Sequence, residues 1–300
     1  LPKITWHLDE PFGDFACIPT HMMSEFARKH VTVCLSGDGG DESFIGYRQS
    51  LFQHHTRLYT KLPVFLKKGI AGICKNFLPD TSYVLKALKN FSIKNDAERS
   101  LSWNRFFDNN LKKRIFSKSM QKHLHSESKI LNKYNKKIKN YTELNKNLYT
   151  EIKTWLPDDA LFKVDKMTMM NSLEDRVPFL DHNIVELAAS IPVKYKVSGF
   201  ETKHILKLAL QDRLPKDIIY RKKHGFNLPT SEWFRNELRV YAQKIIFDKD
   251  LSKFLNLRNV KKLFRKHLSK KEDYRYQLNT LLSFGLWYKI FIKKEDYKKI

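Results

Sequence analysis

The sequence predicts an α/β protein in which a parallel sheet carries extensive helical cover, so that most residues are helical. The short apolar run from Val31 to Leu35 shows no polar alternation beyond Thr32, which is typical of a strand covered on both faces of a parallel sheet. A glycine-rich loop follows this run directly, and amphipathic blocks continue to about Trp155. Helix, strand, glycine loop and helix in this order form part of an α/β unit, whose ligands bind at the carboxyl ends of the strands.

The other elements follow from the spacing of apolar residues. The helix before the strand is predicted to open at Pro19 and Thr20, to end at His30, and to have an apolar face. That face consists of Met22, Met23, Phe26 and Ala27. After the loop we expect short helical blocks over 52–59, 63–77, 101–107 and 111–116. A helix that Pro157 ends is predicted from the stripe Leu144, Leu148, Ile152 and Trp155. A late packing helix without chemistry is predicted from Leu278, Leu281, Leu282, Leu286 and Trp287.

The glycine loop, Ser36 to Ser43, combines glycines with carboxylates. Glycines permit positive φ and close approach to a ligand, and the Ser36 hydroxyl with the loop N–H groups suits an anion. Asp38, Asp41 and Glu42 would repel a phosphate unless Mg²⁺ or a lysine lies between them. The spacing fits neither the GxxxxGK phosphate loop nor the GxGxxG fingerprint. The alternative is a turn in which Asp41 and Glu42 only cap the next helix.

Composition bounds the function classes. The 300 residues contain 56 Lys and Arg against 32 Asp and Glu, for a formal net charge of +24. Lysines are scattered, without an arginine-rich arm, a recognition helix or an aromatic stripe, so we expect no specific nucleic-acid partner. Three separated cysteines without a CxxC pair indicate neither a disulfide framework nor a zinc site, and we expect a cytoplasmic protein. No apolar run is long enough for membrane insertion.

The segment from Leu156 to Asp181 is the second informative stretch. Asp158 and Asp159 are expected at a helix start, and ionisable side chains then stand among apolar neighbours, a pattern that indicates pairing or binding. These side chains are Asp165, Lys166, Glu174, Arg176 and Asp181. The structural alternative is a network of Arg176 with Glu174 and Asp181. Asp181 also fits the N-cap of a following helix.

The third stretch carries basic side chains next to a glycine. Thr202 to Leu206 is followed by the run Arg221, Lys222, Lys223, His224 and Gly225, with Phe226 to anchor the turn. This arrangement suits a cationic clamp for phosphoryl oxygens. A surface basic cluster is an equal alternative in so lysine-rich a chain.

Together, these stretches resemble the synthetase domain of glutamine-hydrolysing asparagine synthetases. The matching stretches run from Asp9 through the glycine loop, from Leu156 to Asp181, and from Thr202 to Trp233, in the family's order. The resemblance implies a PP-loop ATP-pyrophosphatase-like fold and a two-step reaction that uses ATP and Mg²⁺. The aspartate β-carboxylate is adenylated with release of pyrophosphate, and ammonia from a glutaminase domain then attacks β-aspartyl-AMP to give asparagine and AMP.

The resemblance also implies roles for particular residues. Ser36, Gly37 and Gly39 occupy nucleotide-contacting positions, and Asp38 is the loop acid tied to acyl-adenylate formation. Asp41 would hold Mg²⁺, and Lys223 would neutralise phosphoryl charge. Glu174 matches a position that supports the second step, where the attacking amine loses a proton.

Several departures from the family pattern accompany these matches. The Ser-Gly-Gly-x-Asp-Ser loop and the glutaminase domain with its nucleophilic cysteine do not occur in this sequence. We therefore expect a C-terminal portion that is inactive alone and needs its parent chain, with a homodimer left open. Within it, 1–50 would form the α/β core with the glycine loop, 51–155 the helical cover, 156–240 the active-site helices and loops, and 241–300 the C-terminal helices. Asp175 adds an acid between Glu174 and Arg176 that would retune Arg176.

Two alternative functions follow from the same residues. The motifs fix adenylation but leave the acyl acceptor open, so another carboxylate, such as a surface sugar acid or a peptide, is an alternative substrate. A noncatalytic basic protein that holds RNA on a relic synthetase fold is the alternative from a different class, because the charge is high and the pyrophosphate loop does not occur here.

Overall fold

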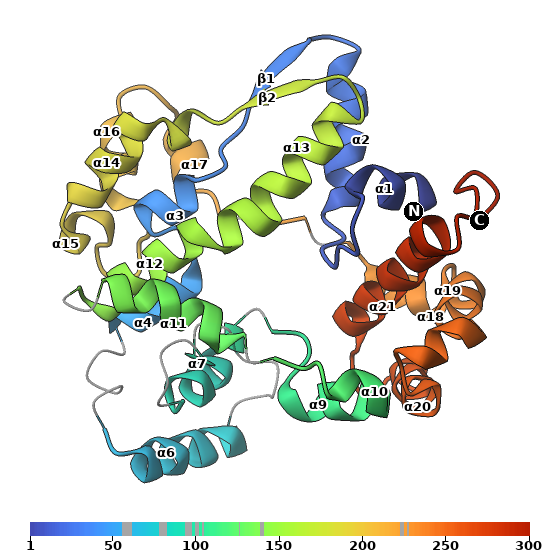
Figure 1. Ribbon diagram of the computed structural model, residues 1–300. Coiled ribbons are helices and arrows are strands. Elements are labelled where there is room, and N and C mark those ends of the chain that lie inside the picture. Colours follow the sequence, from blue (N-terminus) through green and yellow to red (C-terminus); the bar gives the residue numbers. More distant parts are fainter. Residues whose placement is uncertain are drawn as a thin grey trace.

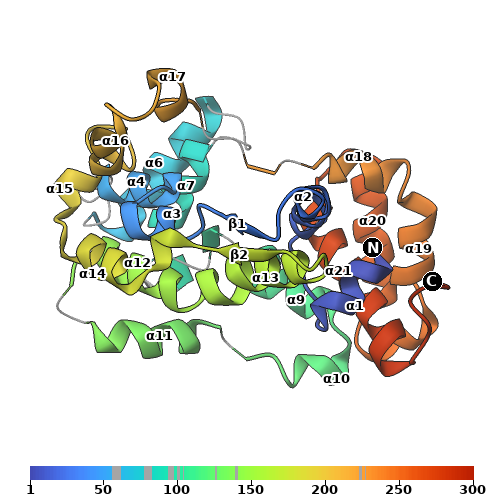
Figure 2. The same cartoon turned by 90° about the horizontal axis from the view of Figure 1, so that it is seen from above.

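The computed structural model describes residues 1–55, 62–77, 83–93, 98–99, 102–103, 105–125, 127–138, 141–222, 225–226 and 228–300. Within these ranges the protein is mostly helical, with one two-stranded parallel sheet formed by β1 (Val33–Leu35) and β2 (Glu174–Arg176). In both views the sheet and the helix that leads into β2 lie between two groups of helices (Figures 1 and 2). The coarse prediction of helices around a parallel sheet is therefore confirmed.

The sheet is less covered than the sequence predicted. Val33 pairs with Glu174, Cys34 with Asp175 and Leu35 with Arg176. Leu35 is 71% exposed, and Val33 is exposed as well. The prediction of a strand covered on both faces is wrong for the described residues, because two strands form a sheet too narrow to hold a helical layer on each side.

Helix α2 (Cys17–Arg28) precedes β1 and begins two residues earlier than predicted. Asp14 Oδ1 accepts from the N–H of Ala16 at 3.0 Å at this start, and Pro19 occupies the first turn, where proline is tolerated. The apolar face that the sequence predicted for this helix points to solvent, with Met22 62% and Phe26 65% exposed. The buried residues of α2 are Cys17, Thr20 and Ser24.

The middle of the chain is helical, as predicted. Its helices are α3 (Gly40–Phe44), α4 (Arg48–His55), α6 (Val64–Phe77), α7 (Tyr83–Phe91), α9 (Asn109–Ile115), α10 (Lys118–Gln121), α11 (Ser128–Lys137) and α12 (Glu143–Lys153). The predicted blocks over 52–59 and 101–107 lie partly outside the described residues. In α11, Leu131 is buried.

Helix α12 leads through a π-helical turn, η1 (Leu156–Leu161), into α13 (Phe162–Met169) and then β2. Leu144 and Leu148 of the predicted stripe are buried, and Asp158 and Asp159 lie in the first turn of η1, as expected. Pro157 lies at the start of this turn, four residues after α12 ends. This segment carries the chain from the helical cover to the sheet (Figure 1).

After β2 come η2 (Pro178–Leu180), α14 (His182–Ser190), α15 (Val193–Lys196), α16 (His204–Leu210) and α17 (Lys216–Ile219). The last part of the chain forms α18 (Thr230–Arg235), α19 (Arg239–Ile246), η3 (Lys249–Lys253), α20 (Leu257–Leu268), α21 (Arg275–Trp287) and η4 (Tyr288–Ile292). These last helices share the largest buried apolar cluster, which includes Phe234, Phe264 and Leu278. The predicted packing helix is thus confirmed as α21.

The amino-terminal helix α1 (Pro2–Leu8) packs on the last helices of the chain. The Trp6 ring stacks on Phe291 and on Tyr297, with 5.3 Å between ring centroids in each pair. The Trp287 indole N–H donates to the Asp9 carbonyl at 3.2 Å. Among the helices that the structure describes, none combines the length and the apolar character needed to cross a bilayer.

Candidate functional site

The glycine loop joins the carboxyl end of β1 to α3. The Ser36 N–H donates to the Arg176 carbonyl at 3.0 Å and so extends the pairing with β2 past the strand. Gly39 has φ +81°, and a Cβ there would lie 2.1 Å from Leu180 Cδ2. Because a side chain at this position meets both a strained backbone and a steric clash, glycine is required for the loop to pack against η2.

The Ser36 hydroxyl lies between two carboxylates. Ser36 Oγ is 2.8 Å from Asp38 Oδ2 and 2.9 Å from Asp175 Oδ2, and the Cys34 thiol lies 3.3 Å from Asp175 Oδ1. The hydroxyl predicted to face an anion therefore donates into an acidic pair. Among the described residues, no basic side chain comes within ion-pair distance of Asp38 or Asp175. A cation is the ligand that this pair favours.

Asp41 contacts a lysine, as the loop chemistry required. Its Oδ1 lies 2.7 Å from Lys203 Nζ, in a half-buried ion pair. A Cβ on Gly46 would lie 1.9 Å from Asp41 Oδ1 and 2.6 Å from Lys203 Cε, so this glycine makes room for the pair. Lys203 has φ +55° at the start of α16, a conformation unfavourable for a lysine. The sequence placed Lys203 in a basic stretch but did not single it out. The lysine it did single out, Lys223, lies outside the described residues.

Glu42 is buried beside Asp41. The Tyr47 hydroxyl donates to its Oε1 at 2.6 Å, and the Trp155 indole N–H donates to the Tyr47 hydroxyl at 3.3 Å. Burial raises the pKa of Glu42, although the hydrogen bond from Tyr47 opposes this shift. Both acids lie in the first turn of α3, as the capping alternative expected, but their side chains contact Lys203 and Tyr47.

Glu174 lies on the exposed side of β2. Its Oε1 is 2.7 Å from Arg176 Nε, and both side chains are more than half exposed. Asp175 points to the opposite side of the strand, toward Ser36, so its expected effect on Arg176 does not come from contact. Asp181 caps α14 by accepting from the Asn183 N–H at 2.9 Å. One half of the predicted structural network is thus present, and the predicted N-cap is confirmed.

Residues 1–289 match the family model described as asparagine synthase. The chain belongs to the asparagine synthase family. It is 34% identical over 297 residues to asparagine synthetase 1 (glutamine-hydrolyzing) of Bacillus subtilis, an alignment that covers 98% of this chain and 46% of that protein. It is 31% identical over 294 residues to a putative asparagine synthetase of Mycobacterium tuberculosis H37Rv, covering 98% of this chain and 44% of that protein.

A shorter match is 42% identical over 113 residues to a putative asparagine synthetase 2 of Methanocaldococcus jannaschii, covering 33% of this chain and 22% of that protein. The chain spans about half the length of the first two relatives. No solved structure matches it significantly.

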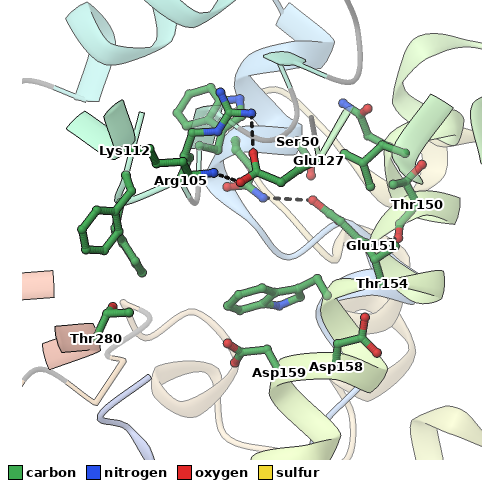
Figure 3. Close-up of a pocket in the computed structure, with 17 residues that line it drawn as sticks. Ser50, Arg105, Lys112, Glu127, Thr150, Glu151, Thr154, Asp158, Asp159 and Thr280 are labelled. Carbon is green, nitrogen blue, oxygen red and sulfur yellow. Dashed lines mark hydrogen bonds and ion pairs between the residues drawn. The ribbon is translucent and has the colours of Figure 1, made fainter. Parts of the chain in front are cut away.

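A cavity of about 470 Å³ that the sequence did not predict is lined in part by α4, α12 and η1. The Gln49 amide donates to Glu151 Oε1 at 2.9 Å on its wall, which joins α4 to α12. Figure 3 shows Arg105 and Lys112 beside Glu127 at one end of the cavity. Burial raises the pKa of Glu151 to about 7, so this carboxyl changes charge near neutral pH.

Asp158 and Asp159 lie at the other end of this cavity (Figure 3). Lys163 Nζ lies 2.5 Å from Asp14 Oδ2 and 3.6 Å from Asp159 Oδ1, and so bridges the amino-terminal segment to η1. Burial, followed by the charge of Asp14, raises the pKa of Asp159 to about 6. Asp159 thus takes part in a structural ion pair.

The loop offers carboxylates as potential ligands for Mg²⁺. Among the described residues, no three His, Cys, Asp or Glu side chains gather closely enough to form a metal site of their own. Mg²⁺ in nucleotide sites is usually held by one or two carboxylates plus phosphate oxygens and water. Asp41 is a carboxylate of the kind that such a partial set uses.

Proposed function

We propose that this chain forms the part of an asparagine-synthetase site that binds ATP and activates a carboxylate. The observation that carries the proposal is the contact between two motifs far apart in the sequence. Parallel pairing of β1 with β2 brings Ser36 to Asp175, and Gly39 packs against Leu180. This contact lies at the carboxyl ends of the strands, where α/β sheets bind ligands.

In the proposed reaction, ATP adenylates the aspartate β-carboxylate and releases pyrophosphate. Ser36, Gly37 and Gly39 would contact the nucleotide, and Asp38 would act at the acyl-adenylate. Open space around Gly37 supports this role, because no described atom beyond its chain neighbours lies within 4 Å of where its Cβ would be. Lys223 belongs to the proposal as a phosphoryl contact on sequence grounds alone.

Ammonia would then attack β-aspartyl-AMP to give asparagine and AMP. Glu174 would accept the proton that the attacking amine loses, and its exposed carboxylate at the strand end is accessible for this role. Mg²⁺, held by Asp41 together with phosphate oxygens, would neutralise the charge of the departing pyrophosphate. Lys203 holds the Asp41 carboxylate in place.

We further propose that activity needs polypeptide beyond this chain, including a glutaminase domain that supplies ammonia. The exposed apolar side chains of β1 and α2 support this, because a complete PP-loop-like sheet would cover them. In this proposal, residues 1–50 form the α/β core with the glycine loop, and residues 51–155 form the helical cover. Residues 156–240 form the remaining elements of the site, and residues 241–300 form the C-terminal helices.

The test is isotope exchange between pyrophosphate and ATP. It is measured on the full-length product of the gene, which includes this chain. We expect exchange only when the carboxylate substrate is present, and at least a hundredfold loss on Asp41→Ala because the metal and the lysine lose their carboxylate. Asp212→Ala, which removes an exposed acid outside the site, is the matched control. Exchange that survives Asp41→Ala would remove Asp41 from the metal role.

Release of AMP with a panel of acids separates the substrates. Aspartate is expected to give the highest rate, whereas a sugar acid or peptide that exceeds it would identify a different acceptor. Steeply salt-dependent RNA binding without AMP release from any acid would instead favour the noncatalytic alternative.

A further inference from the structure

A second cavity, of about 280 Å³, lies on the far side of α3 from Asp41. Residues of α3, α12, α14 and α15 line it, and these helices lie together in Figure 1. Asp41 and Ser43 are two residues apart on α3 and so project to opposite sides of the helix. Asp41 pairs with Lys203, whereas Ser43 lines the cavity. The cavity is therefore separate from the proposed nucleotide site, and the inference does not depend on the proposed function.

Lys196, in α15, contributes a cation to this cavity. Its side chain is buried, with the residue only 4% exposed, and no acid in the described part of the chain lies within ion-pair distance of Nζ. Burial lowers its pKa to about 8, and no neighbouring carboxylate offsets this shift. A lysine is rarely buried without a partner because desolvation of the ammonium is costly.

Ser43 contributes a buried hydroxyl to the same cavity. The residue is 4% exposed, and its hydroxyl is buried without a hydrogen-bond partner among the residues that the structure describes. A buried hydroxyl without a partner loses its hydrogen bonds to water and gains none in the protein, which is unfavourable. This atom therefore also indicates a missing acceptor. The remaining wall is largely apolar, with Leu148, Ile152 and Val185.

We propose that this cavity binds a small carboxylic acid with an apolar tail. The carboxylate would lie against the ammonium of Lys196 and accept from the hydroxyl of Ser43, and the tail would lie against Leu148, Ile152 and Val185. A carboxylate supplies both the charge and the acceptors that these two groups lack. Glu42 also lines the cavity, but its carboxylate is held by Tyr47, and its repulsion would orient the ligand's carboxylate toward Lys196.

The probe is 4-methylpentanoate, titrated into the 300-residue chain and followed by saturation-transfer NMR. We expect saturable binding that weakens at least tenfold when the acid is replaced by its neutral amide. Lys196→Met should weaken binding of the acid at least tenfold, and Ser43→Ala about threefold. Lys194→Met is the matched control, because it removes an exposed lysine from the same short helix and should leave binding unchanged.

Lys196→Arg separates a lost charge from a disturbed fold, since it keeps the cation and should retain most of the binding. Equal binding of the acid and its amide would overturn the proposal. The absence of saturable binding to the unmodified chain, or unchanged binding in Lys196→Met, would overturn it as well.

Discussion

The last helices of the chain and the α2–β1 region use similar apolar residues in opposite ways. Phe264 in α20 is 1% exposed and Leu278 in α21 is fully buried, whereas Phe26 in α2 is 65% and Leu35 in β1 is 71% exposed. The last helices pack closely enough that a Cβ on Gly285 would lie 2.7 Å from Ile245 Cγ2. The C-terminal helices thus enclose most of a core, to which Phe15 and Ile115 also contribute, and the sheet region does not.

The difference lies in what each region can cover with its own residues. Several amphipathic helices can enclose a core from all sides, whereas a parallel sheet needs a layer on each face. The buried residues of helix α2 are Cys17, Thr20 and Ser24. The hydroxyls of Thr20 and Ser24 each donate to the backbone carbonyl four residues earlier, at 2.8 and 2.7 Å. Its Met and Phe side chains remain as an apolar surface of the kind that marks interaction sites.

The largest effect expected from this comparison is on stability. Phe264→Ala should lower the free energy of unfolding by about 3–5 kcal/mol, because it leaves a cavity in the C-terminal core. Phe26→Ala, the same change on the exposed face, should alter it by less than about 0.5 kcal/mol. Urea unfolding measures both. Equal losses would mean that α2 is as well packed in solution as α20.

The second largest expected effect is a pH dependence of the free energy of unfolding that arises in the C-terminal helices. His267 is fully buried in the C-terminal core, where Nε2 lies 3.0 Å from the Ser231 carbonyl and Nδ1 accepts from the Tyr274 N–H at 3.1 Å. Burial lowers its pKa, so the unfolded chain binds the proton more readily than the folded one. Stability should therefore fall as pH drops below about 6.5, by at most about 1.4 kcal/mol per pH unit for one proton.

Unfolding by urea at pH 7.5, 6.5 and 5.5 measures this slope, and hydrogen exchange locates it to α18–α21. The slope should shrink in His267→Gln and persist in His182→Gln, which changes an exposed histidine. An unchanged slope in His267→Gln would assign the pH effect to another group.

A substitution in β1 should have the smallest effect on the free energy of unfolding but should clearly reduce self-association of the chain. Leu35→Lys places a charge on the exposed strand and should change the free energy of unfolding by less than about 0.5 kcal/mol. The isolated chain should then bind less of a hydrophobic dye and self-associate less in sedimentation. A loss of more than about 2 kcal/mol would show instead that Leu35 is buried in solution.

Features that depend on neighbouring residues in the sequence were predictable. Which apolar surfaces other segments would bury was not. The Asp181 cap and the packing of α21 depend on residues within one or two turns, and both were predicted. The burial of β1 depends on what lies across the sheet, which no local pattern encodes. The periodicity of α2 identified its apolar side correctly but could not say whether anything packs there.

In the candidate site, too, local features were predictable from the sequence and long-range contacts were not. Glycine spacing identified the loop, but Lys203 was missed because its contact with Asp41 joins residues far apart in the sequence. The contact of Ser36 with Asp175 needed the strand register, since a shift of one residue would have turned Asp175 to the other face. A lysine at positive φ leaves no trace in composition or periodicity.

The pairing of β1 with β2 also has a kinetic consequence. The chain between Ser36 and Asp175 spans 139 positions, so the loop closure that unites them carries a large entropic cost before any contact repays it. The helices of the C-terminal core, by contrast, are joined by short connections and can associate early. The glycine loop should therefore reach its final form among the last events of folding, after the helices around it have already formed.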